Sequence, residues 1–177
     1  WFTARFQSAA QSPATALVPS SLQQLRVLVV DDNATNLEIT STHLRRWGIA
    51  CDVADYAPSA LVTLKAAARD GRPYSLAILD MQMPDMDGGE LIELIRQTPE
   101  LSNLPLMMLT SMGEELTPEQ LNAWRLTDAL NKPIRQSRLF DAVINASCQN
   151  THEVVSEIES AVPTLCASEV RANHHIL

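Results

Sequence analysis

The sequence has few cysteines and no cluster of basic residues, and both absences exclude classes of protein. The three cysteines, Cys51, Cys148 and Cys166, are odd in number, scattered and not in CxxC spacing, which argues against a disulfide framework and against a zinc site. The formal net charge is −8, whereas a surface that binds nucleic acid needs grouped Lys and Arg to meet phosphates. We therefore expect no nucleic-acid partner.

Long apolar segments are also absent. No run approaches the roughly 18 consecutive apolar residues of a transmembrane helix, and no signal peptide opens the sequence. Scattered cysteines are typical of a reducing compartment. We therefore expect this part of the protein to be cytoplasmic and to make no membrane contact, although a longer parent protein could be membrane-anchored.

From Leu25 onward, short apolar segments alternate with amphipathic ones. Strands are expected at about residues 26–30, 50–54, 76–80, 104–109 and 128–130, each followed by a helix. Continuous apolar runs rich in Val, Ile and Leu suit parallel strands with helices on both faces. Such alternation, with right-handed crossovers, predicts a doubly wound α/β sandwich.

The expected helices show their own start and stop signals. The first spans about residues 35–47, with Gly48 as its C-terminal cap. The second should bury the face formed by Ala57, Leu61, Leu64 and Ala68. A capping box at residues 117–120 opens the fourth, and the last should bury Leu139, Ala142, Val143 and Ala146.

Four of the expected strands deliver a polar residue at their carboxyl ends. The first runs into Asp31 and Asp32, the third ends on Asp80, the fourth leads to Thr110, and the fifth leads to Lys132. Ligands of open parallel sheets bind beyond these strand ends. We therefore expect the five side chains to form one site.

The residue types at this site indicate phosphoryl transfer with a metal. Two carboxylates about 4 Å apart repel by roughly 4 kcal/mol at an effective dielectric near 20, so three acids favour a bound cation. Hard oxygen ligands favour Mg²⁺, which also accepts phosphate oxygens. Asp80 could then act as a nucleophile and form an aspartyl phosphate, while Lys132 neutralises phosphoryl charge and Thr110 offers a hydroxyl.

Four motifs carry a resemblance to a known family. The segments VLVVDDNATN, LAILDMQMPDMDG, LMMLTS and LNKPI resemble, in order and spacing, the receiver domain of two-component response regulators over about residues 25–147. The resemblance implies a flavodoxin-like (βα)5 fold whose five-stranded parallel sheet has the order 2-1-3-4-5. It also implies a phosphorelay function for the chain.

The same resemblance assigns roles to individual residues. It makes Asp80 the phosphoacceptor and Asp32 the more direct Mg²⁺ ligand. The further Mg²⁺ ligands that it implies are Asp31, Asp80 and the backbone carbonyl of Gln82. It makes Lys132 the phosphate-contacting residue, with a cis peptide bond before Pro133, and it implies a switch region of Thr110, Ser111, Ala129 and Pro133.

Two positions depart from the family pattern. Ala129 stands where many receivers have a switching aromatic residue, and Trp124-Arg125 replaces the usual turn of small residues. Acceptor chemistry should survive both changes. They put in doubt the coupling of Thr110 to an aromatic ring.

Segments at the chain ends and two internal segments resemble parts of hybrid sensor histidine kinases. WFTARF resembles the last strand of a kinase ATP-binding domain, and DDNATNLEI and RRWGI resemble hybrid-kinase receivers. The expected organisation is the end of an ATP-binding domain (1–7), a linker (8–24), a receiver (25–147), a second linker (148–173) and the start of a second receiver (174–177). The implied partners are a kinase phosphohistidine domain, in the same parent chain, and a histidine phosphotransfer domain or protein.

Three functions remain open from the sequence. The first is a phosphoacceptor that is not itself an enzyme, within a parent phosphotransferase. The second is a receiver-like docking module that is never phosphorylated. The third is a haloacid-dehalogenase-type phosphohydrolase, which is disfavoured because Gln82 occupies the position of its second acid.

Overall fold

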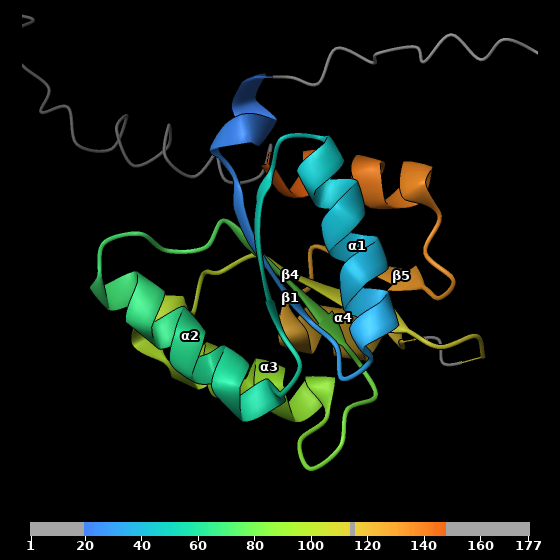
Figure 1. The fold of residues 1–177 in the computed structure, drawn as a ribbon. Coiled ribbons are helices and arrows are strands. Elements are labelled where there is room, and N and C mark those ends of the chain that lie inside the picture. Colours follow the sequence, from blue (N-terminus) through green and yellow to red (C-terminus); the bar gives the residue numbers. More distant parts are fainter. Residues whose placement is uncertain (1–19, 114–115, 148–177) are drawn as a thin grey trace, which may run out of the picture.

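A computed structural model describes residues 20–113 and 116–147, which form a five-stranded parallel sheet between helices (Figure 1). The strands are β1 (Arg26–Val30), β2 (Ala50–Ala54), β3 (Leu76–Asp80), β4 (Leu106–Thr110) and β5 (Asp128–Asn131). Their order is β2-β1-β3-β4-β5, and every neighbouring pair is parallel. The predicted flavodoxin-like, doubly wound fold is confirmed.

The helices form one layer on each face of the sheet. They are α1 (Ala34–Arg46), α2 (Ala57–Arg69), α3 (Gly88–Gln97), α4 (Pro118–Trp124) and a final helix over residues 136–147, with short 3-10 helices at η1 (Ser20–Gln24) and η2 (Pro99–Leu101). One core contains Val27 and Val29 with α1 and the final helix. The other contains Leu28 and Val30 with α2 and α3. Successive β1 side chains thus supply both cores, as the period of a strand requires.

Side-chain caps define where the helices start. Asn33 precedes α1 and accepts a hydrogen bond from the Thr35 N–H. Asp87 forms a capping box with Glu90 at α3, and the predicted capping box of Thr117 at α4 is present. Each cap satisfies N–H groups that the first helical turn leaves without partners. The turns that follow β1 and β3, where the site lies, are therefore well defined.

The structure differs from the sequence expectations in three places. Strand β4 begins at Leu106 instead of residue 104, because Pro105 has no N–H to give to a ladder. The buried face of helix α2 is rotated from the predicted one. It consists of Ala57, Ala60, Leu64 and Ala67. The predicted residues Leu61 and Ala68 are only partly buried, although they pack against the core. Strand β2 lies at the sheet edge and is largely exposed, unlike the fully covered strand that an apolar run suggests.

The predicted domain boundaries are only partly within the described residues. The expected linker over 8–24 overlaps η1, where Leu22 is buried in the α1-side core, so its last residues belong to the folded unit. The segments expected at 1–7, 148–173 and 174–177 lie outside the described residues. Among the helices that are described, none combines the length and apolar character needed to cross a membrane.

Helix α4 is attached to the rest of the fold mainly by two side chains. None of its seven residues is fully buried. The Trp124 ring lies against Gly89, where an added Cβ would come within 2.8 Å of the ring. Arg96 of α3 donates hydrogen bonds to the carbonyls of Trp124 and Arg125 at 3.1 Å each. Trp124 is thus a packing residue.

Candidate functional site

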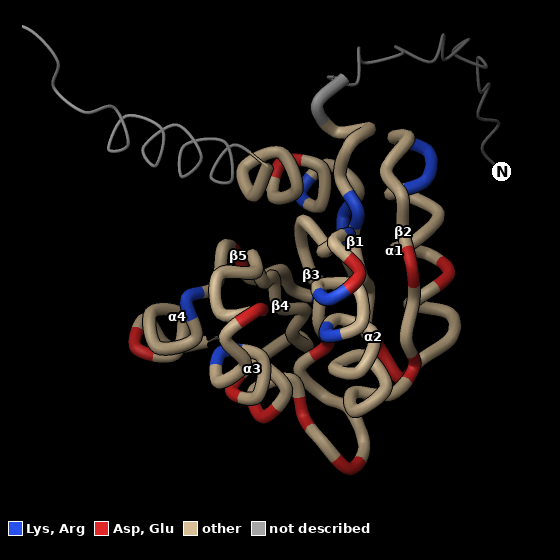
Figure 2. Tube along the Cα trace, turned by 90° about the vertical axis from the view of Figure 1, so that its left-hand side faces the viewer, with Lys and Arg blue, Asp and Glu red and all other residues tan. Residues whose placement is uncertain are grey.

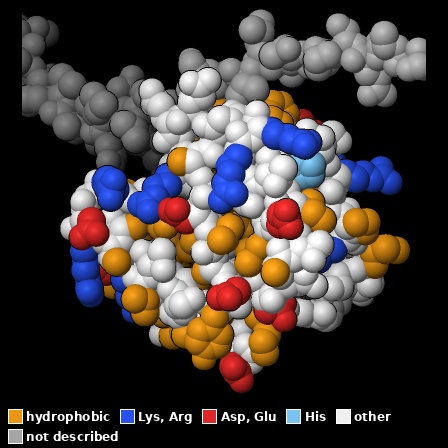
Figure 3. All heavy atoms as spheres, in the orientation of Figure 1, with side chains coloured by type: hydrophobic (Ala, Val, Ile, Leu, Met, Phe, Trp, Pro, Cys, Tyr) orange, Lys and Arg blue, Asp and Glu red, His pale blue; other side chains and the backbone are white. Residues whose placement is uncertain are grey.

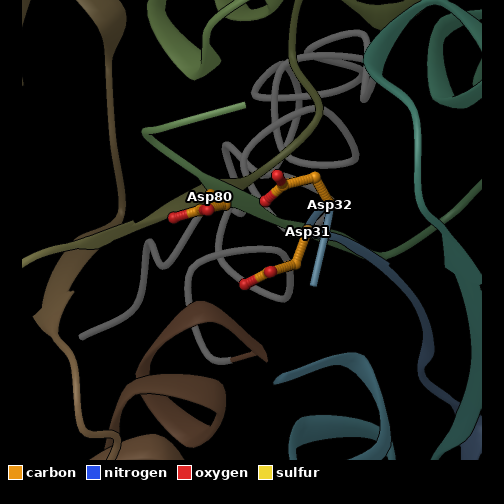
Figure 4. A group of neighbouring side chains, drawn as sticks. All are labelled: Asp31, Asp32 and Asp80. Carbon is orange, nitrogen blue, oxygen red and sulfur yellow. The ribbon is translucent and has the colours of Figure 1, made fainter. Parts of the chain in front are cut away.

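The three acids predicted to converge do lie together at the carboxyl ends of β1 and β3. One carboxylate oxygen from each of Asp31, Asp32 and Asp80 can be chosen so that all lie within 4.8 Å of one another. Their side chains point to the same side (Figure 4). Asp31 and Asp80 are buried, whereas Asp32 is exposed.

Acidic and basic side chains are partly separated over the surface around this cluster. Acidic segments occur in the loops at the lower end of the molecule in Figure 2. On the face drawn in Figure 3, the Lys and Arg side chains lie mostly in the upper part. The cluster therefore lies at an end of the sheet where nearby exposed loops add negative charge and attract cations.

Lys132 joins the cluster from the end of β5. Its ammonium lies 2.7 Å from a carboxylate oxygen of Asp31 and 2.7 Å from one of Asp80. The Lys132 N–H donates to the carbonyl of Thr110 at 2.7 Å, which fixes the backbone at this strand end. The peptide bond between Lys132 and Pro133 is cis, as the resemblance implied.

Both oxygens of Asp31 already accept hydrogen bonds. Oδ2 accepts from Lys132, while Oδ1 accepts from the Asn33 N–H at 2.9 Å and from the Asn36 amide at 3.1 Å. The exposed Asp32 is therefore the acid with more open access to a hydrated cation. Sequence reasoning missed the role of Asn36, although its place in the first turns of α1, five residues after Asp31, was a usable signal.

The electrostatics of the cluster favour an added cation. Burial raises the pKa of Asp80, and the Asp31 charge raises it further, against the hydrogen bonds from Lys132 and from the Gln82 backbone. Burial alone would lower the pKa of Lys132, but its hydrogen bonds and charge interactions with Asp31 and Asp80 outweigh burial and raise it. The single ammonium of Lys132 does not balance the negative charge of the three carboxylates. Their oxygens are the hard donor atoms that Mg²⁺ prefers, so the cluster fits this ion.

An open cleft lies above the cluster. Its volume is about 720 Å³, and its lining residues include Asp32, Asp80, Gln82, Ser111 and Lys132. The Ser111 hydroxyl lies 3.5 Å from the side-chain oxygen of Gln82. This cleft has room for a hydrated ion and a phosphoryl group beside Asp80.

The loop after β3 is held close to the strand end. The Gly88 N–H donates to the carbonyl of Met81 at 2.9 Å. A Cβ at position 88 would lie 2.3 Å from the carbonyl oxygen of Asp80, a distance that no real side chain tolerates. Glycine at this position therefore allows α3 to begin directly beside Asp80.

The residues predicted as a switch region lie on β4 and β5 and in the segments that follow them. Thr110 is buried, and its hydroxyl donates to the side-chain oxygen of Asn131 at 2.8 Å. Ala129 is half-buried and packs against the α3-side core. Asn131 was not predicted as a site residue. The available signal was register, because Asn131 lies directly opposite Thr110 in the parallel pair.

Comparisons with known proteins agree with this geometry. The sequence model described as "Response regulator receiver domain" matches residues 27–144. The chain is 28% identical to the signal transduction histidine-protein kinase BarA of Escherichia coli (strain K12), over 92% of this chain and 17% of the kinase. It is 33% identical to the sensor histidine kinase GacS of Pseudomonas protegens, over 67% of this chain and 13% of that kinase. The chain thus spans less than a fifth of either relative.

Solved structures show the same fold. The chemotaxis response regulator CheY4 of Vibrio cholerae superposes with a TM-score of 0.60 at 26% identity, covering 69% of this chain and 98% of that one. A response regulator receiver protein from Pseudomonas putida superposes with a TM-score of 0.58 at 30% identity, covering 67% of this chain and 94% of that one. The strand-end acids, the lysine beside them and these likenesses place the chain in the response regulator receiver domain family.

Proposed function

We propose that this chain accepts a phosphoryl group from a kinase phosphohistidine onto Asp80 and passes it to a histidine phosphotransfer domain or to water. The supporting observation is the contact of the Lys132 ammonium with both Asp31 and Asp80 at 2.7 Å. This contact places a cation beside the acid that would react. The isolated chain is then a phosphoacceptor module and does not turn over a substrate of its own.

In this proposal a carboxylate oxygen of Asp80 attacks phosphorus. The phosphorus–nitrogen bond to the donor imidazole breaks, and its electron pair returns to the ring nitrogen. Lys132, already 2.7 Å from Asp80, neutralises charge on the transferred group. Burial of Asp80 limits competition from water before transfer.

Mg²⁺ would be held by Asp32, Asp80, the Gln82 carbonyl and Asp31, and when bound it would offset phosphoryl charge. Asp31 would be a less direct ligand than Asp32, because both of its oxygens already accept hydrogen bonds, from Lys132, Asn33 and Asn36. Asp32 supplies the exposed carboxylate of the cluster.

The relatives support a hybrid-kinase context. BarA and GacS are named as histidine kinases, and the proposed donor is a phosphohistidine domain of the same parent chain, at the cytoplasmic side. A phosphohydrolase is disfavoured, since Gln82 offers no carboxyl group for proton transfer to a leaving group.

The test is to incubate the chain with acetyl phosphate and Mg²⁺ and to locate the added phosphoryl group by peptide mass spectrometry. We expect it on Asp80, and we expect Asp80→Asn to abolish labelling. The matched control is Asp85→Asn in the same loop, which should be labelled like wild type because Asp85 lies outside the cluster. Labelling of Asp80→Asn would contradict the proposal. No labelling of wild type by acetyl phosphate or by a phosphorylated kinase would favour the docking module.

A further inference from the structure

The hydroxyl of Thr110 is already committed to a specific acceptor. It donates to Oδ1 of Asn131 at 2.8 Å. Thr110 is almost fully buried, at 1% exposure, while Asn131 lies exposed at the end of β5. The two residues are register partners in the β4–β5 pair, so the contact joins neighbouring strands at the site end of the sheet.

A hydroxyl has one proton and can donate one hydrogen bond at a time. Strand β4 is also the neighbour of β3, which ends in Asp80. A phosphoryl group on Asp80 would bring strong, charged acceptor oxygens to this end of β4. Hydrogen bonds to ionised acceptors are roughly twice as strong as hydrogen bonds between neutral groups. The Thr110 hydroxyl would therefore donate its hydrogen bond to the phosphoryl group instead of to Asn131.

We propose that Asn131 is a positioning residue that holds the Thr110 hydroxyl while Asp80 is unmodified, and that phosphorylation releases the Asn131 side chain. This inference rests on the proposed phosphoacceptor function. Asn131 then supplies the coupling between Thr110 and β5 that Ala129, lacking an aromatic ring, does not.

The surroundings of Asn131 allow its release. A groove of about 520 Å³ lies beside β5, and its lining includes Met112, Ala129, Asn131 and Arg138. Because Ala129 is small, the groove has space next to the Asn131 amide. The released amide can donate and accept hydrogen bonds there, so the surface of β5 would change with the state of Asp80.

The test compares affinities for beryllium fluoride, a phosphoryl analogue, in the presence of Mg²⁺. Asn131→Leu keeps the shape of the side chain but removes the acceptor. We expect it to bind the analogue about fivefold more tightly, which corresponds to removal of one competing hydrogen bond of about 1 kcal/mol. Asn131→Ala should act in the same direction and serves as a second variant. The exposed Asn122 of α4 supplies the control Asn122→Leu, which should bind like wild type.

A double-mutant cycle separates positioning from a general structural effect. Thr110→Val removes the donor, so Asn131→Leu should have no further effect on analogue affinity in that background. Unchanged affinity in Asn131→Leu, or an equal gain in the Thr110→Val background, would overturn the inference. Failure of wild type to bind the analogue with Mg²⁺ would instead overturn the phosphoacceptor function itself.

Discussion

Lys132 and Asp31, which are 101 residues apart in the sequence, form a hydrogen bond of 2.7 Å across the end of the sheet. The Asp31 side chain is 1% exposed and that of Lys132 is 21% exposed. The pair links the end of the last strand to the end of the first, with Asp80 between them. Its removal would leave buried carboxylates without a balancing charge.

The first prediction concerns Lys132→Met. Loss of one partner of a buried ion pair costs about 3–5 kcal/mol, and since Lys132 is partly exposed we expect a loss of about 2–3 kcal/mol in the free energy of unfolding. The folded-state pKa of Lys132 is raised, so its contribution is fully present below the unfolded value near 10.4 and is lost as pH rises through the folded value. Urea unfolding at neutral pH measures the change. The exposed Arg69→Met is the control, and an equal loss there would refute the assignment.

The second prediction is that Asp80→Asn stabilises the metal-free chain. The raised pKa of Asp80 means that the folded state binds more protons than the unfolded state between the two pKa values. Wild-type stability therefore falls as pH rises through that window. At neutral pH without Mg²⁺ we expect the variant to melt roughly 2–6 °C higher. Millimolar Mg²⁺ should stabilise wild type more than the variant; a lower melting temperature for metal-free Asp80→Asn would contradict this account.

The third prediction concerns a cluster at the opposite end of the sheet. The Tyr74 hydroxyl donates to Asp52 at 2.8 Å, and Arg26 lies 2.7 Å from the same carboxylate oxygen. Burial, together with the hydrogen bond to Asp52, raises the pKa of Tyr74 to about 12. The stabilisation is present below the unfolded pKa near 10 and is lost as pH rises toward the folded value.

Tyr74→Phe should therefore cost about 1 kcal/mol at neutral pH and should reduce the loss of stability at alkaline pH. Tyr56→Phe leaves Tyr74 as the one tyrosine of the chain. Ultraviolet titration of this variant should show a tyrosinate step above the ordinary tyrosine value near 10. A step at the ordinary value would contradict the hydrogen bond to Asp52.

The fourth prediction contrasts the adjacent residues Gly88 and Gly89. A Cβ at Gly88 would meet the backbone carbonyl of Asp80 at 2.3 Å, whereas one at Gly89 would meet the end of the Trp124 ring at 2.8 Å. The backbone carbonyl of Asp80 can move less than the Trp124 ring, which can rotate. We therefore expect Gly88→Ala to lower the free energy of unfolding more than Gly89→Ala does, by about 3 kcal/mol or above. Thermal unfolding ranks the two variants. Gly88→Ala should also weaken Mg²⁺ binding, because Asp80 must move; the reverse ranking would show that the loop adapts.

Sequence patterns predicted the strand bounds well where an apolar run ended in polar residues. The bounds of β1, β2 and β3 match the expected ones. The start of β4 was misplaced because Leu104 is apolar, while Pro105 has no N–H to donate to a neighbouring strand. The face of α2 was misjudged because alanines on several sides of that helix give a weak period.

The site was predictable as far as strand ends determine it. Asp31, Asp32, Asp80 and Lys132 converge because parallel strands end at one edge. The contacts of Asn36 and Asn131 depend on side-chain direction and on strand register. The pattern of polar residues at strand ends does not by itself fix either one, so neither contact was predicted.

The thin attachment of α4 has a consequence for protection of its amide protons. Local opening costs less free energy for an element that buries little apolar area, and α4 is held chiefly by the Trp124 ring and the Arg96 guanidinium. In deuterated buffer, the amides of α4 should exchange long before those of β1 and β3. This exchange would occur by local unfolding of α4 while the sheet stays folded.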